Sequence, residues 1–198
     1  MKHIEIAKRV IQEESNALQI LSKNIPKSFD EVIDYILQLE GSVIMTGLGK
    51  SGYAAQKISK SLSSTGTIAF YVHPTEASHG DLGMITSKDM VIMISNSGET
   101  QELLSILHYC RKFNIKTAII TMNPVSILAD QSDFLLNIPQ TQEASSIGAP
   151  TTSVLLALSI GDAISIALQE AKNFKKNDFH TYHPGGWIGR NAFSNHKS

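Results

Sequence analysis

The sequence contains little of what would mark several classes of protein. Its one cysteine, Cys110, can form no disulfide within the chain and no cysteine-based metal cluster. The formal net charge of -1 offers no basic field to attract nucleic acid. No apolar run approaches the roughly 20 residues of a membrane span, and the first ten residues mix charged with apolar side chains, unlike a signal peptide. We therefore expect a cytoplasmic protein without a nucleic-acid or membrane partner.

What is present is the composition of a globular domain. Hydrophobic residues make up 42% of the chain and charged residues 18%, which argues against disorder. A chain of 198 residues can bury one sizeable core, and no internal repeat or linker divides it. We expect one domain over residues 1–198, with N-terminal helices at 1–40, a sheet core at 41–171 and a C-terminal active-site segment at 172–198.

Strand and helix patterns alternate along the chain. Short apolar runs typical of buried strands lie at 42–47, 68–72, 89–95, 116–122 and 133–138. Helical spacing occurs twice in the first forty residues and again at 50–65, 99–113 and 150–171. The pattern predicts an α/β fold, a three-layer sandwich in which a five-stranded parallel sheet is flanked by helices.

Two details of the predicted helices can be tested. Ser28 and Glu31 have the spacing of a capping box at the start of the second helix. The helix at 150–171 is apolar on all sides, which favours burial in an oligomer interface, with a central position in the domain as the alternative.

The stretch "GLGKSG" at residues 47–52 matches parts of two nucleotide-binding motifs. A P-loop would need a glycine at position 44, where Ile44 stands inside the predicted strand. A dinucleotide fold would need an acidic residue at the end of the second strand, but Val72 and His73 are there and Glu76 follows a proline. What both motifs share remains: glycines let the backbone approach an anion, and the helix that starts near Ser51 points its free N–H groups at it. We interpret the stretch as an anion-binding turn of neither type.

Two further loops at the same edge of the predicted sheet are rich in hydroxyl groups. Ser95, Ser97 and Thr100 surround Gly98 immediately before a helix, although simple helix capping by Ser97 is an alternative explanation. Another helix start contains Thr151, Thr152 and Ser153. Several hydroxyl-lined helix starts around one sheet edge indicate a site for a phosphorylated small molecule.

Five motifs in a fixed order resemble the sugar isomerase (SIS) domain of the arabinose 5-phosphate isomerases. They are "GLGKSG" at 47–52, "HPTEASHGDLGMI" at 73–85, "SNSGETQEL" at 95–103, "EASSIGAPTTS" at 143–153 and "HPGGWIGR" at 183–190, and the resemblance extends from about residue 10 to residue 190. Ser145 and Ser146 replace the usual Cys-Pro. Many members continue into a tandem CBS pair, whereas this chain stops at Ser198, so the resemblance implies a catalytic domain without nucleotide sensing through those modules.

The resemblance implies an activity. Members of the family interconvert ribulose 5-phosphate and arabinose 5-phosphate through an enediolate, which supplies the first intermediate of Kdo biosynthesis and needs no metal or organic cofactor. By motif position, the catalytic residues are Lys50, Glu102, Glu143 and His183. The resemblance further implies a homotetramer and leaves CMP-Kdo open as a feedback ligand.

Each of the four residues suits a role. Lys50 would neutralise the phosphate or the enediolate. Glu143 lies in an otherwise uncharged loop, where its pKa can be raised, and we expect it to be the C–H base. Glu102 is the rival base, although the helix dipole favours an acid at that position regardless of function. His183 suits ring opening or proton shuttling. Its segment is expected to act across a subunit interface, as in related SIS domains.

The remaining expected contacts are with the substrate. They are Gly49, Ser51, Gly66, Thr67, His73, His79, Ser95, Ser97, Gly98, Thr100, Thr151 and Thr152. Adventitious zinc at His73 is left open, while His180 and Cys110 are expected to be a surface histidine and a helix thiol. The alternative function is a sugar-phosphate sensor without catalysis, although the chain has no spare helix-turn-helix segment.

Overall fold

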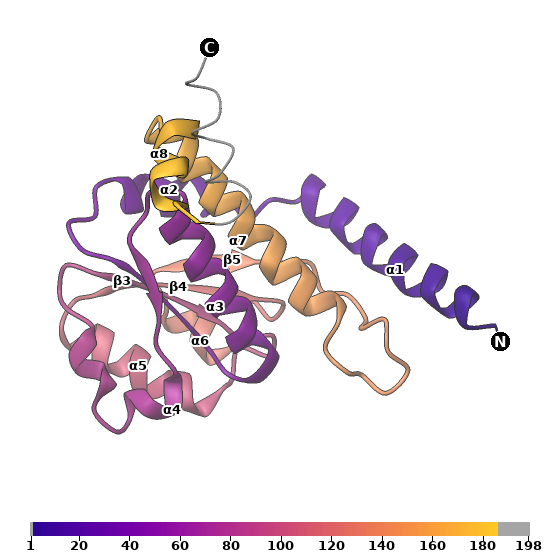
Figure 1. Cartoon of the computed structure of the whole chain (residues 1–198). Helices are drawn as coiled ribbons and strands as arrows, with labels where there is room; N and C mark the ends of the chain where they lie inside the picture. Colours follow the sequence, from indigo (N-terminus) through magenta and orange to yellow (C-terminus); the bar gives the residue numbers. More distant parts are fainter. Residues whose placement is uncertain (1, 186–198) are drawn as a thin grey trace, which may run out of the picture.

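Five parallel strands form a single sheet in the computed structural model, which describes residues 2–185 (Figure 1). The strands are β1 (Val43–Gly47), β2 (Ala69–Tyr71), β3 (Met90–Ile94), β4 (Lys116–Thr121) and β5 (Phe134–Asn137), in the order β2-β1-β3-β4-β5. Every residue of β1 and β3 is buried. These two strands lie inside the sheet and are covered on both faces, so their sequences are continuous apolar runs. The expected five-stranded parallel sheet is confirmed.

Helices cover both faces of the sheet (Figure 1). One core cluster joins the sheet to α1 (His3–Lys23), α2 (Phe29–Leu37), α3 (Gly49–Ser64) and α7 (Thr152–Ala171). The other joins the opposite face to α4 (Pro74–Ala77), α5 (Gln101–Lys112) and α6 (Ile127–Gln131). The expected three-layer α/β sandwich is therefore present.

The apolar helix α7 has a central position in the domain, and its expected burial in an oligomer interface stays a prediction. It packs against α1, α2 and α3, and Gly161 lies where an added Cβ would come within 2.3 Å of the Ile58 side chain. By length and composition alone α7 could cross a membrane, which corrects the expectation that no apolar run approaches that length. Half of its apolar window is buried inside the domain, as in the core helix of a globular protein.

Several local features differ from the sequence predictions. The side chain of Ser28 makes no capping hydrogen bond at the start of α2, so the predicted capping box is wrong. Helix α3 begins at Gly49, two residues before Ser51. Four short elements had not been predicted, because their apolar periods are too brief to recognise: α4, the 3-10 helix η1 (Asp81–Met84), α6 and α8 (Lys176–Tyr182).

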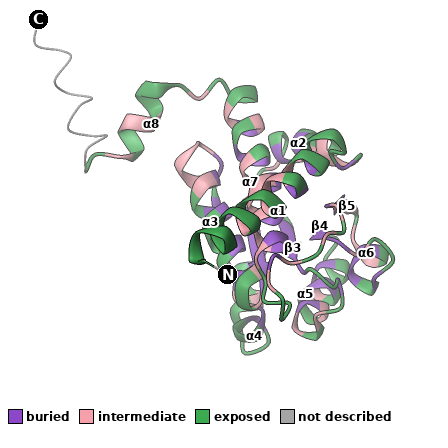
Figure 2. Cartoon of the chain, turned by 90° about the vertical axis from the view of Figure 1, so that its right-hand side faces the viewer, coloured by how far each residue is buried: buried purple, intermediate pink, exposed green. Residues whose placement is uncertain are grey.

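Two helices extend from the body of the domain. Only Ala17 and Leu21 are buried in α1, and α8 has no buried residue. Both helices are therefore largely exposed in Figure 2. Of the motif at 183–190, residues 186–190 lie outside the described residues.

Candidate functional site

Three loops meet where β1, β3 and β5 end. A void of about 10 Å³, room for about one water molecule, is lined there by Ser51 of α3, Asn96 of the loop after β3 and Ser153 of α7, together with Ile94, Ile120 and Ile138 at the strand ends. The carboxyl edge of a parallel sheet is the usual ligand position in α/β folds. Ser51 lies in the first turn of α3, where backbone N–H groups have no partner within the helix, so this helix start suits an anion. The N–H of Ser153 at the start of α7 donates to the Glu143 carboxylate.

The turn "GLGKSG" depends on two of its glycines. Gly49 has a φ of 59°, a conformation that favours glycine. A Cβ on Gly52 would lie 2.7 Å from the carbonyl oxygen of Gly47, so only glycine lets α3 start this close to β1. Lys50 is exposed on the first turn, with its Nζ 5.8 Å from the centre of the Tyr53 ring.

The loop after β3 is ordered by its own hydroxyl groups. The Oγ of the buried Ser95 lies 2.8 Å from Oγ1 of Thr100 and accepts a hydrogen bond from the Gly98 N–H at 3.1 Å. The Ser97 hydroxyl is exposed and accepts from the Glu99 N–H at 3.2 Å. Glu102 is half-buried in the first turn of α5. Gly98 is required because a Cβ there would come within 1.9 Å of the Ser126 hydroxyl.

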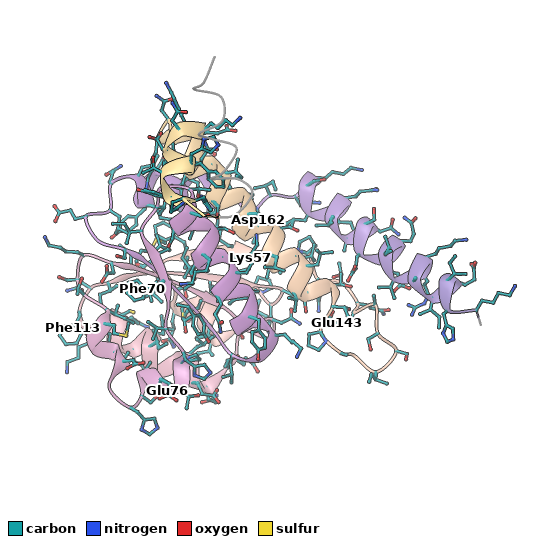
Figure 3. The ribbon with its side chains drawn as sticks, viewed as in Figure 1. Lys57, Phe70, Glu76, Phe113, Glu143 and Asp162 are labelled. Carbon is teal, nitrogen blue, oxygen red and sulfur yellow. The ribbon has the colours of Figure 1, made fainter. Side chains whose placement is uncertain are left out.

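Glu143 caps the N-terminus of α7 (Figure 3). Its Oε2 accepts hydrogen bonds from the Thr151 N–H at 2.8 Å, the Thr151 hydroxyl at 3.2 Å and the Ser153 N–H at 3.2 Å. Burial alone would raise the pKa of the carboxyl group, but the hydrogen bonds from Ser153 and Thr151 outweigh it and lower the pKa. The expectation of a raised pKa is therefore wrong, because an uncharged sequence neighbourhood does not reveal backbone donors.

A larger cavity of about 750 Å³ lies beside Glu143. It is bounded by Arg9, Glu13 and Asn16 of α1 and by the loop at 141–148. Nη1 of Arg9 donates to the Ala144 carbonyl at 3.3 Å, so α1 holds this loop. Sequence reasoning missed Arg9, whose helical neighbourhood carries no sign of a long-range contact. It also missed Asn96, although Asn96 lies inside a recognised motif.

The two expected histidines after β2 have different surroundings. Nδ1 of His73 accepts from the Thr75 N–H at 3.3 Å and caps α4. His79 is exposed. Within residues 2–185 no three His, Cys, Asp or Glu side chains are grouped as metal ligands would be.

Other expected residues lie at the far end of α7. Gly66 packs against the Phe174 ring, and Lys172 donates to the Gly66 carbonyl at 3.3 Å and to Oγ1 of the buried Thr67 at 2.8 Å. His183 ends α8, with Nδ1 2.7 Å from the Phe179 carbonyl oxygen and its ring stacked on that of Phe179 at 4.0 Å. The 20 residues of α7 separate this end from Glu143 by about 30 Å. One chain therefore does not bring His183, Gly66 or Thr67 to the carboxyl edge.

The remaining expected residues lie at the carboxyl edge of the sheet. Gly49, Lys50, Ser51, Thr151 and Thr152 occupy the starts of α3 and α7. The side-chain hydroxyl of Thr152 is buried and has no partner among the described residues. The structure thus brings together the turn after β1, the loop after β3 and the start of α7.

Comparison with known proteins gives a consistent picture. The chain is 57% identical over 186 residues to the uncharacterized protein RP505 of Rickettsia prowazekii and 44% identical over 189 residues to the arabinose 5-phosphate isomerase KpsF of Escherichia coli O6:H1. Each alignment covers 94% of this chain and 58% of the relative, so the chain spans less than two thirds of the curated relatives it matches. The solved structure of E. coli CFT073 c3406 in complex with arabinose 5-phosphate superposes with a TM-score of 0.88 at 40% identity, covering 91% of this chain and 97% of the other. The SIS domain model matches residues 36–167, and the chain belongs to the SIS domain family.

Proposed function

We propose that the protein is an aldose-ketose isomerase that interconverts D-ribulose 5-phosphate and D-arabinose 5-phosphate through an enediolate. The observation that carries the proposal is the convergence at the carboxyl edge of the start of α3, the loop after β3 and the start of α7, whose residues Ser51, Asn96 and Ser153 line a common void. The hydroxyl groups of these segments and the N–H groups at the start of α3 match the needs of a phosphate monoester. Similarity to isomerases over 94% of the chain supports the same substrate class.

The phosphate and the developing negative charge require fixed donors. We assign the phosphate to the turn that contains Gly49 and Ser51 and to the hydroxyl groups of Ser95, Ser97 and Thr100. The exposed ammonium of Lys50 stands at the same turn and neutralises the charge of the phosphate or enediolate. His73 and His79, together with Thr151 and Thr152, complete the proposed substrate contacts.

Proton abstraction needs a carboxylate whose oxygen atoms are not already held by hydrogen bonds within the protein. Glu143 is held by three hydrogen bonds that lower its pKa, which makes it a weaker base. Glu102 receives no side-chain hydrogen bond from the described residues. We therefore assign C–H abstraction to Glu102, and we assign to Glu143 the positioning of Thr151 and Ser153 at the start of α7.

His183 opens the furanose form of arabinose 5-phosphate in this proposal, as a histidine that can exchange protons near neutral pH. Its place about 30 Å from Glu143 in the same chain supports the proposal that it enters the site of a second copy. A homotetramer would provide such neighbours. Gly66 and Thr67, which lie near the start of α8, would then contact substrate only in that second site. The product would enter Kdo biosynthesis in the cytoplasm.

The test is incubation with ribulose 5-phosphate in deuterium oxide, with the product followed by NMR. We expect arabinose 5-phosphate that carries deuterium from the solvent, in the presence of a chelator. Binding of sugar phosphate without turnover would favour the sensor instead. Turnover that appears only after a metal is added would overturn the cofactor-free chemistry.

A further inference from the structure

The turn after β1 is tied to β2 by a side chain. In the pairing of these strands the Val72 N–H donates to the Met45 carbonyl at 3.0 Å. The next step of this parallel ladder would join the N–H of residue 74 to the Gly47 carbonyl. Pro74 has no N–H. Instead the Tyr71 hydroxyl donates to the Gly47 carbonyl oxygen at 2.8 Å.

That hydrogen bond fixes the orientation of one peptide plane. The carbonyl of residue 47 and the N–H of Leu48 belong to the same planar trans peptide, so they point in opposite directions. Holding the Gly47 carbonyl toward β2 therefore directs the Leu48 N–H toward β3. The register of β1 with β3 pairs Gly47 with Ile94, so the Leu48 N–H points toward the Ile94 carbonyl of that ladder. The Tyr71 hydrogen bond therefore holds the end of β1 in its place between β2 and β3.

The contact is also tightly packed. A Cβ on Gly52 would lie 2.7 Å from the Gly47 carbonyl oxygen and 3.0 Å from the Tyr71 hydroxyl oxygen. Burial raises the pKa of the Tyr71 phenol, so the group keeps its proton and remains a donor. The Tyr71 ring meets the His73 ring edge-on, with 6.2 Å between centroids.

We propose that Tyr71 is the positioning residue of the anion-binding turn, because its hydroxyl holds the Gly47 carbonyl beside Gly52 and so fixes where α3 begins relative to β1. The inference rests on the proposed function in one respect, that the turn binds the phosphate of the substrate. Tyr71 itself does not touch the reacting atoms.

Tyr71→Phe removes only the hydroxyl group, and Tyr109→Phe is its matched control. Tyr109 is also half-buried, and its hydroxyl also donates to a backbone carbonyl, that of Ile85, at 3.0 Å. The two variants should lose similar stability in urea. Titration with inorganic phosphate and with arabinose 5-phosphate should show about 3- to 10-fold weaker binding for Tyr71→Phe, and no change for Tyr109→Phe. The KM should rise by a similar factor while kcat changes less.

The outcomes separate this inference from the proposed function. Unchanged phosphate binding in Tyr71→Phe, or an equal loss in both variants, would overturn the role of Tyr71 while leaving the isomerase intact. A selective loss in Tyr71→Phe without any isomerase activity in the wild-type protein would support Tyr71 and remove the proposed reaction. A wild-type protein that binds neither phosphate ligand would overturn both.

Discussion

The two ends of α7 differ in their surroundings, which are polar and charged at the N-terminus and aromatic at the C-terminus. At its N-terminus, the Glu143 carboxylate accepts hydrogen bonds from the Thr151 and Ser153 N–H groups. Beyond its C-terminus, the aromatic rings of Phe174 and Tyr182 pack together with their centroids 5.4 Å apart. One end therefore holds a negative charge from within the chain, and the other holds an aromatic pair at the point where the chain continues into α8.

In the proposed reaction, a single copy would lack His183 at its own carboxyl edge. Burial holds the pKa of the Lys172 amine below its ordinary value at the C-terminal end, where its hydrogen bonds go to Gly66 and Thr67. These hydrogen bonds join the end of α7 to the turn that contains Gly66 and Thr67. His183 belongs to this end, so in the proposed reaction it would act on a site that another copy provides.

The largest expected effect comes from mixing two impaired variants. Glu102→Gln and His183→Ala should each lower turnover of arabinose 5-phosphate by about 100-fold or more. After subunit exchange, a mixture of the two should recover up to about a quarter of wild-type activity, because mixed assemblies contain sites with both native residues.

The matched control for that mixture is Glu102→Gln with Lys50→Ala. Both residues belong to the same end of one chain, so no mixed assembly regains a complete site. Equal recovery in the two mixtures, or none in the first, would contradict the separation of His183 from Glu102.

The second effect concerns the packing at the C-terminal end. Gly66 and Gly148 both have positive φ, 91° and 72°, but only a Cβ on Gly66 would meet another residue, at 2.5 Å from the Phe174 ring. Gly148→Ala should cost about 1 kcal/mol through backbone strain. Gly66→Ala should cost about 2 to 3 kcal/mol, since a clash is added.

Urea denaturation measures both changes. In a Phe174→Ala background the added cost of Gly66→Ala should fall to that of Gly148→Ala. If the cost in that background is as large as in the wild-type protein, the Phe174 ring does not constrain this turn.

The smallest effect is the acid dependence of the Glu143 cap. Because the folded-state pKa is lowered, its stabilisation is complete above the ordinary glutamate pKa of about 4.3 and is lost as pH falls through the lowered value. Glu143→Gln should cost about 0.5 to 2 kcal/mol at pH 7 and much less at pH 3. Urea unfolding at both pH values tests this, with the exposed Glu170→Gln as control. The same cost at both pH values would show that the charge is not what stabilises the cap.

The sheet and the loops at its carboxyl edge could be predicted because their signals are local. Apolar strands β1, β3 and β4, and the glycines at 49 and 52, follow from burial and backbone sterics alone. The state of Glu143 could not be predicted, since its donors come from Thr151 and Ser153 after a turn whose geometry the sequence does not show. Tyr71 escaped notice for a similar reason, because it occupies an ordinary strand position.

Because α7 is long, a small tilt of the helix at one end produces a larger displacement at the other. Its 20 residues form a stiff rod of about 30 Å. A tilt of about 5° around one end would move the other by roughly 2 to 3 Å. A ligand that draws Ser153 toward the carboxyl edge would therefore displace Lys172, together with the Phe174 and Tyr182 rings at α8. If His183 serves the site of a second copy, as proposed above, such a motion would link the two sites.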